Sequence, residues 1–159
     1  MKYVTTRFGE IEFKEEEIIE VAKGILGFPK LRRYVVIAEK KDSHFRWLQS
    51  VEDSSIAFVV ANPTDFFPQY RIKLRLSELE ELKLDRTEDL LVFVIMTVPR
   101  SNPAEISANL LGPLILNPFK RLAKQVVLTD SPYTTRHYVI EALNKRLRTE
   151  DEKVEFSAV

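Results

Sequence analysis

The chain has 159 residues, with 24 basic side chains, 24 acidic ones, a formal net charge of +0 and no cysteine. This length fits one ordinary domain, and a hydrophobic content of 45% argues against bulk disorder. The charge balance argues against a protein that binds nucleic acid through a dominant basic field, and the lack of cysteine excludes disulfides, thiolate metal sites and cysteine nucleophiles.

Short strand-like segments dominate the first part of the chain. Tyr3–Phe8 and Ile11–Phe13 flank Gly9-Glu10 and predict a tight hairpin, because glycine tolerates a positive φ. The segment Ile18–Lys23 is compatible with either helix or strand. Further strands rich in β-branched and aromatic residues are expected at Arg33–Ala38, Phe45–Val51 and Ile56–Ala61.

A strand followed by a helix is expected in the middle of the chain. Tyr70–Leu76 alternates apolar and basic residues, which is typical of a half-exposed strand. Ser77 and Glu80 then have the spacing of a capping box, which predicts a short helix that ends near Leu84.

The remaining elements are a central strand, shorter strands and a helix. Leu90–Val98 reads as a central strand that Pro99 ends, and Tyr138–Leu147 has the apolar spacing of a helix. Shorter strands are expected at Ile106–Leu110, Leu114–Asn117 and Gln125–Thr129.

These elements predict a mainly β protein. We expect a small closed or nearly closed antiparallel β-barrel with a short helix and a C-terminal helical segment. One domain is expected over residues 1–148, followed by a flexible tail over 149–159. Because neither a leader-like segment nor a membrane-length apolar run is present, the expected location is the cytoplasm.

Motifs of catalysis and of metal or cofactor binding are absent from the sequence. Its four glycines form no phosphate-binding loop, and its acidic runs are typical of solvated surface. His44 and His137 are the only histidines, and both are expected to be solvent-exposed. We therefore predict no catalytic residue, no metal site and no cofactor, and we expect a protein that is not an enzyme.

Direct binding of single-stranded RNA remains an alternative. Small barrels bind single strands through basic residues interleaved with aromatic ones, and Arg71, Lys73 and Arg75 lie next to Tyr70. A second basic cluster spans Lys120–Lys124. The simpler interpretation is a solvated strand face and a basic loop, because acidic residues are equally abundant.

Two loops suggest a surface that binds another protein. Asn62–Tyr70 carries three aromatic rings and two prolines, and Pro113 interrupts the strand pattern of Ile106–Pro113. Exposed strand edges accept an added segment from another chain. The alternative is that both segments are fold-defining turns whose rings cover one end of a barrel.

Five segments, in order, resemble one known family, the flagellar assembly factor FliW. They are Gly24–Phe28, Trp47–Ser50, Phe58–Pro63 followed by Phe67–Tyr70, Ala108–Asn117 and Gln125–Tyr133. Together they run from about residue 8 to about residue 138, and each alone is weak. The chain departs from the family pattern at Leu26, where proline is common, and at Gly112, where alanine is common. The residues beyond about Glu141 extend past the family core, so the resemblance implies nothing about them.

This resemblance implies a non-enzymatic regulator with a β-barrel-like fold. FliW-like proteins bind flagellin in the cytoplasm. When flagellin is exported, the freed protein binds the RNA-binding translational repressor CsrA and relieves its block on flagellin mRNA. A neutral protein can thereby control RNA by holding an RNA-binding partner.

The two loops supply the candidate partner-binding residues. We hypothesise that Asn109 gives paired hydrogen bonds to a partner backbone, that Phe66 and Leu110 are apolar anchors, and that Pro113 keeps a strand edge unpaired. The full set is Asn62, Phe66, Tyr70, Ile106, Asn109, Leu110 and Pro113.

Overall fold

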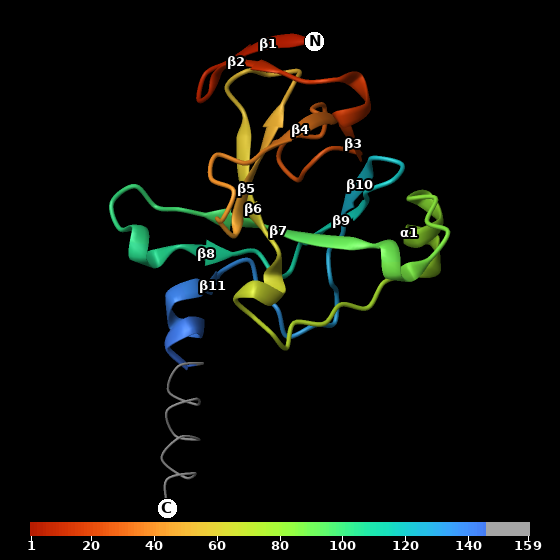
Figure 1. Ribbon diagram of the computed structural model, residues 1–159. Coiled ribbons are helices and arrows are strands. Elements are labelled where there is room, and N and C mark those ends of the chain that lie inside the picture. The colour runs from red at the N-terminus through yellow and green to blue at the C-terminus, as the bar shows by residue number, and fades with distance from the viewer. Residues whose placement is uncertain (146–159) are drawn as a thin grey trace, which may run out of the picture.

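The described strands close into a seven-stranded ring. The computed structural model describes residues 1–145, in which the strand order is β7-β6-β5-β4-β3-β10-β9 and β9 pairs again with β7 (Figure 1). The ring strands are β3 (Ile19–Ala22), β4 (Arg33–Ile37), β5 (Phe45–Ser50), β6 (Ala57–Ala61), β7 (Leu91–Thr97), β9 (Leu114–Asn117) and β10 (Leu122–Gln125). This ring confirms the prediction of a mainly β, closed barrel.

One pair of ring strands departs from the predicted antiparallel order. β3 and β10 pair in parallel, with Glu20 opposite Leu122, whereas the other described ring neighbours are antiparallel. A ring with an odd number of strands cannot reverse direction at every neighbour, so at least one parallel pair is unavoidable. The fold is therefore an antiparallel barrel closed by a parallel seam.

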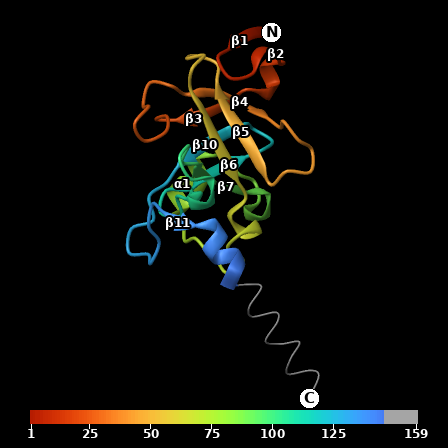
Figure 2. The same ribbon diagram turned by 90° about the vertical axis from the view of Figure 1, so that its left-hand side faces the viewer.

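Smaller elements flank the ring. The hairpin of β1 (Lys2–Thr5) and β2 (Gly9–Glu12) lies at the opposite end of the barrel from helical residues 139–145 (Figures 1 and 2). β8 (Ser107–Ala108) pairs with β7, and β11 (His137–Tyr138) pairs with β8. The short helices are η1 (Glu15–Glu17), η2 (Pro63–Asp65), α1 (Leu76–Glu81), η3 (Thr87–Asp89) and η4 (Pro103–Glu105).

Apolar side chains form two clusters, one on each side of the β6–β7–β9 wall. All seven ring strands contribute to the inner cluster, which fills the barrel and includes Tyr34 and Val60. The outer cluster includes Val94 and Ile115 and is covered by the segments that follow β6, β10 and β11. Consecutive residues of one strand point into different clusters: Val60 belongs to the inner cluster and Ala61 to the outer one. This arrangement explains the near-continuous apolar runs that the sequence shows at β6 and β7.

The predicted strand over Tyr70–Leu76 is wrong. These residues belong to no strand, although burial alternates along Arg71–Arg75 as the sequence pattern suggested. Ile72 and Leu74 pack against the outer cluster, while the intervening basic residues are exposed. The segment is thus extended, but no described strand lies beside it to form a hydrogen-bonded ladder.

The capping box is displaced from its predicted position. α1 begins at Leu76, and Arg75 instead of Ser77 is its N-cap residue. The Arg75 N–H donates to Glu78 Oε2 at 3.0 Å, and the Glu78 N–H donates to the Arg75 carbonyl. The helix ends at Glu81, before the predicted Leu84.

Three other boundaries differ from the sequence-based expectation. The N-terminal turn spans residues 6–8, so that Gly9 opens β2 instead of occupying the turn. The strand expected at Gln125–Thr129 lies earlier, at β10, because residues 118–121 form the turn that pairs β9 with β10. The strand expected at Ile106–Leu110 is only the two-residue β8.

The predicted C-terminal helix is present over residues 139–145. Tyr138, its expected first residue, belongs to β11. The predicted domain end at residue 148 and the predicted tail over 149–159 lie outside the described residues.

Candidate partner-binding groove

The two loops that the sequence singled out meet at one place. The first leaves β6 through η2 and continues to Tyr70, and the second follows β8. The Tyr70 hydroxyl donates a hydrogen bond to the buried Leu110 carbonyl at 2.7 Å. Burial, reinforced by Tyr133, raises the pKa of the Tyr70 phenol, so this group stays protonated and able to donate. The bond ties the two loops together.

A groove with a volume of about 710 Å³ lies where these loops meet the C-terminal segment. Its lining combines an apolar and aromatic floor with charged residues from the last described helix and with Arg136, which precedes β11. The lining residues are Phe66, Phe67, Pro68, Gln69, Tyr70, Leu110, Tyr133, Arg136, His137, Tyr138, Glu141, Ala142 and Lys145.

Aromatic rings from distant parts of the chain pack edge to face along the groove. The Tyr70 and Tyr133 ring centroids are 4.6 Å apart, and His137 contacts both Tyr133 and Phe67 with centroids about 6 Å apart. The Tyr133 hydroxyl accepts a hydrogen bond from the Arg71 N–H at 3.1 Å. These contacts fix the shape of the groove from both sides.

His137 is a neutral part of the groove and not the solvent-exposed residue that the sequence suggested. Its side chain is half-buried, and Nε2 accepts a hydrogen bond from the Thr134 N–H at 2.9 Å. Burial lowers the pKa of His137, which favours the neutral imidazole that this hydrogen bond requires. Exposed Arg136 and Glu141 supply charge near this uncharged ring.

The predicted anchors Phe66 and Leu110 form the groove floor and do not project from it. Their exposed fractions are 7% and 1%, and both belong to the outer apolar cluster. The Phe66 ring also stacks on Phe45, with centroids 5.6 Å apart. Because so little of either side chain is accessible, both support the groove from below, and their role as apolar anchors for a partner stays a prediction.

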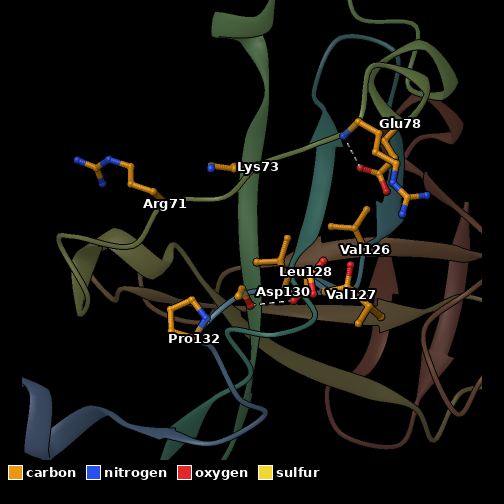
Figure 3. Close-up of a pocket in the computed structure, with 11 residues that line it drawn as sticks. Arg71, Lys73, Glu78, Val126, Val127, Leu128, Asp130 and Pro132 are labelled. Atoms are coloured by element: carbon orange, nitrogen blue, oxygen red, sulfur yellow. Dashed lines mark hydrogen bonds between the residues drawn. The ribbon is translucent and has the colours of Figure 1, made fainter.

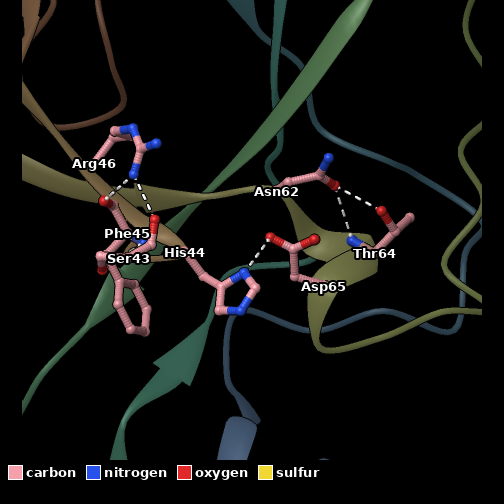
Figure 4. Close-up of polar contacts among 7 residues, drawn as sticks. All are labelled: Ser43, His44, Phe45, Arg46, Asn62, Thr64 and Asp65. Carbon is pink, nitrogen blue, oxygen red and sulfur yellow. Dashed lines mark hydrogen bonds and ion pairs between the residues drawn. The ribbon is translucent and has the colours of Figure 1, made fainter. Parts of the chain in front are cut away.

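Asn62 has a structural role at the start of the first loop. Its Oδ1 accepts hydrogen bonds from the Thr64 N–H at 3.0 Å and from the Thr64 hydroxyl at 2.8 Å, which caps η2 (Figure 4). In the same view His44 Nδ1 lies 3.1 Å from Asp65 Oδ2. His44 is exposed, as predicted.

The second loop is closed by hydrogen bonds, so Pro113 does not leave an unpaired edge as predicted. Its carbonyl accepts from the Val126 N–H at 3.0 Å, and its side chain is buried. Asn109 is half-buried, and its Oδ1 accepts from the Gly112 N–H at 2.9 Å. Ile106 packs against the outer cluster. Asn62, Ile106, Asn109 and Pro113 are not groove-lining residues, unlike Phe66, Tyr70 and Leu110.

Four groove-lining residues were not predicted from the sequence: Phe67, Tyr133, His137 and Tyr138. Their proximity comes from the β7–β8–β11 pairing, which brings the C-terminal segment back to the first loop. The available signal was a shared pattern: Tyr133 follows a proline closely, as Tyr70 follows Pro68.

A known protein family matches most of this chain. The sequence model of the family described as FliW protein matches residues 2–139. The chain belongs to the FliW family. That match spans all the strands of the barrel, both candidate loops and the first residue of the C-terminal helix.

Curated relatives and a solved structure support the FliW assignment. A flagellar assembly factor FliW from Magnetococcus marinus is 40% identical over 88% of this chain and 85% of its own length. Relatives with the same description from Syntrophus aciditrophicus and Geobacter sulfurreducens are 40% and 41% identical, over 89% and 86% of this chain and 89% and 85% of their own lengths. A crystal structure of the flagellar assembly factor FliW covers 87% of this chain and 96% of its own, with a TM-score of 0.80 and 35% identity.

Two further observations concern only residues 1–145. No helix in this range is both long and apolar enough to cross a membrane. In the same range, no group of three His, Cys, Asp or Glu side chains is placed to hold a metal ion.

Proposed function

We propose that this FliW-family chain is a flagellar assembly factor that acts by binding other proteins and not by catalysis. In this proposal it binds flagellin in the cytoplasm. When export of flagellin frees it, it binds the translational repressor CsrA and relieves repression of flagellin mRNA. The observation that carries the proposal is its 40% identity, over 88% of the chain, to a protein named flagellar assembly factor FliW.

The groove is the surface that we assign to partner binding. Its apolar floor and charged rim resemble the anatomy of protein–protein interfaces, in which a few buried aromatic residues carry most of the affinity. Phe67 and Tyr133 are half-buried and supply the accessible ring surface. The remaining candidates hold that surface in place: Phe66, Tyr70 and Leu110 from the floor, and Asn62, Ile106, Asn109 and Pro113 from the supporting loops.

Exchange between two partners follows from mass action. A protein that binds flagellin and CsrA distributes itself according to their free concentrations and affinities. Export lowers the concentration of flagellin, so more of the factor becomes free to bind CsrA. This mechanism needs no chemical step and no cofactor.

Calorimetric titration of the purified protein with flagellin and with CsrA from the same organism tests the proposal. We expect both to bind, and we expect Phe67→Ala to weaken binding of at least one partner about tenfold or more. Phe119→Ala is the matched control, because Phe119 is 77% exposed and lies outside the groove. Thermal unfolding of each variant checks that the fold is intact.

The results of these titrations test the proposed function and the assignment of the groove independently. If the wild-type protein binds neither flagellin nor CsrA, the proposed function is wrong. If both bind but Phe67→Ala behaves like Phe119→Ala, the function stands and the assignment of the groove is wrong.

A further inference from the structure

The extended segment Arg71–Arg75 has backbone groups that nothing in the described chain satisfies. Ile72, Lys73 and Leu74 make no backbone hydrogen bond with any residue of 1–145. At the two ends, the Arg71 N–H donates to the Tyr133 hydroxyl and the Arg75 N–H donates to Glu78. Since backbone N–H and C=O groups normally pair with each other in extended chains, the middle of this segment resembles a strand without a neighbour.

Packing holds the segment in this extended form. Ile72 and Leu74 are half-buried against the outer apolar cluster, and the residues between them are exposed. N–H groups of alternate residues on an extended chain point to the same side. The Lys73 N–H therefore points to the same side as the Arg71 N–H, which is the side of Tyr133.

A second extended segment, Val126–Leu128, lies across a cleft from the first. The Val126 and Leu128 N–H groups donate to the carbonyls of Pro113 and Leu111, so the Val127 N–H points the other way. That N–H donates to no described residue. Figure 3 shows the two segments on opposite sides of the cleft, whose volume is about 360 Å³.

The cleft carries mainly positive charge on the Arg71–Arg75 side. Lys73 and Arg75 have exposed side chains without a hydrogen bond or ion pair to any residue of 1–145. The Arg71 guanidinium donates to the backbone carbonyls of Pro68 and Tyr70 and keeps its charge. Two acids also line the cleft: Glu78, whose Oε2 accepts the Arg75 N–H, and Asp130 on the opposite side.

We propose that this cleft accepts an extended, acidic peptide segment of a partner protein as an added strand. A peptide carbonyl would accept from the Val127 N–H, whose own carbonyl already accepts from the Thr129 N–H at 3.1 Å. The other edge of the peptide would pair with the backbone of Lys73, and its acidic side chains would face Lys73 and Arg75. A single-stranded RNA fits less well, because no aromatic ring lines the cleft and stacking platforms are what such strands require. The inference goes beyond the proposed function, since it depends on neither the groove nor the identity of its partners.

Fluorescence anisotropy with defined peptides tests the proposal on the full chain. The probe is a labelled octapeptide of alternating glutamate and valine. The comparison probes are the lysine–valine counterpart, the acidic peptide N-methylated at every valine, and an eight-nucleotide oligouridine RNA. We expect the acidic peptide to bind, and the N-methylated and basic peptides to bind about tenfold more weakly or worse, because one lacks N–H donors along one edge and the other lacks the charge match.

Substitutions on the protein separate charge from backbone pairing. Lys73→Glu should weaken binding about tenfold, whereas Lys120→Glu, the same change at an exposed lysine outside the cleft, should leave it within about twofold. Lys73→Pro removes an N–H that has no partner in the described chain, so it should weaken binding more than Lys73→Ala does. Thermal unfolding checks each variant.

Amide hydrogen exchange gives a readout that does not depend on any variant. The Lys73 and Val127 amides should exchange rapidly in the free protein and become protected when the acidic peptide is added. The proposal is overturned if the acidic peptide does not bind, if N-methylation leaves its affinity unchanged, or if the RNA binds more tightly than the peptide. Loss of flagellin or CsrA binding would not affect these outcomes.

Discussion

At the scale of single residues, the bond from Tyr70 to Leu110 joins the two loops of the groove. Tyr70→Phe keeps the ring and removes the hydroxyl, which leaves the buried Leu110 carbonyl without its donor. We expect the free energy of unfolding to fall by about 1–3 kcal/mol, the usual cost of an unsatisfied buried polar group. Urea unfolding measures this change.

Tyr138→Phe is the control for that substitution. Tyr138 is 43% exposed, and its hydroxyl makes no hydrogen bond with a residue of 1–145. Its loss should change stability by less than about 0.5 kcal/mol. Equal effects of the two substitutions would show that the bond to Leu110 does not hold the loops together.

Gly24 is the position where the backbone leaves no room for a side chain. Its φ is +67°, and a Cβ would lie 2.4 Å from the Phe28 carbonyl oxygen. Gly27 also has a positive φ, of +92°, but a Cβ there would meet nothing within 4 Å. We expect Gly27→Ala to cost about 1–2 kcal/mol from backbone strain, and Gly24→Ala about 1–3 kcal/mol more because of the clash. Chemical denaturation of both variants checks the difference, and equal losses would contradict the clash.

At the scale of elements, β11 links the barrel to the C-terminal helix and contains His137. Burial lowers the pKa of His137 below its ordinary value of 6.5, so the unfolded chain takes up a proton first as the pH falls. The contribution of neutral His137 to stability is therefore present above about pH 6.5 and decreases below it. It stops changing once the pH is below the lowered pKa of the folded state.

The test compares unfolding free energies at pH 7.5 and pH 5 in two variants. His137→Gln, which keeps an acceptor for the Thr134 N–H, should lose less stability on acidification than the wild type. Phe119→Ala, which removes an exposed side chain that does not titrate, should lose as much as the wild type. An NMR titration that places the pKa of His137 at or above 6.5 would contradict the burial argument.

The positions of the strands could be predicted from the sequence better than the pairing between them. β-Branched runs located β4 and β7 within about a residue or two at each end, because strand propensity and burial agree there. Alternation at Arg71–Arg75 correctly marked one buried face, but it could not show that a pairing strand was missing. The site was predicted in part for the same reason: Tyr70 and Leu110 were recognised, whereas Tyr133 and His137 reach them only through pairing between distant strands.

At the scale of the whole molecule, the β1–β2 hairpin is expected to open independently of the barrel. It forms its own two-stranded sheet and is tied to the barrel by the bond from the Thr6 N–H to the Ser54 carbonyl and by packing of Phe8 against Trp47. We expect its amides to exchange hydrogen through local opening, well before those of β6, which lies inside the ring. Exchange mass spectrometry resolves the two peptides, and equally slow exchange would show that the hairpin opens only with the barrel.

The parallel seam also constrains the order of events during synthesis. β3 leaves the ribosome early, but its partner β10 is the last strand of the ring to be made. Until then β3 pairs only with β4 and carries an open edge, the kind of surface on which nascent chains aggregate. Contacts between such distant segments also slow folding, since a long loop must close before they form. The barrel therefore completes its hydrogen bonding only after translation has passed Gln125.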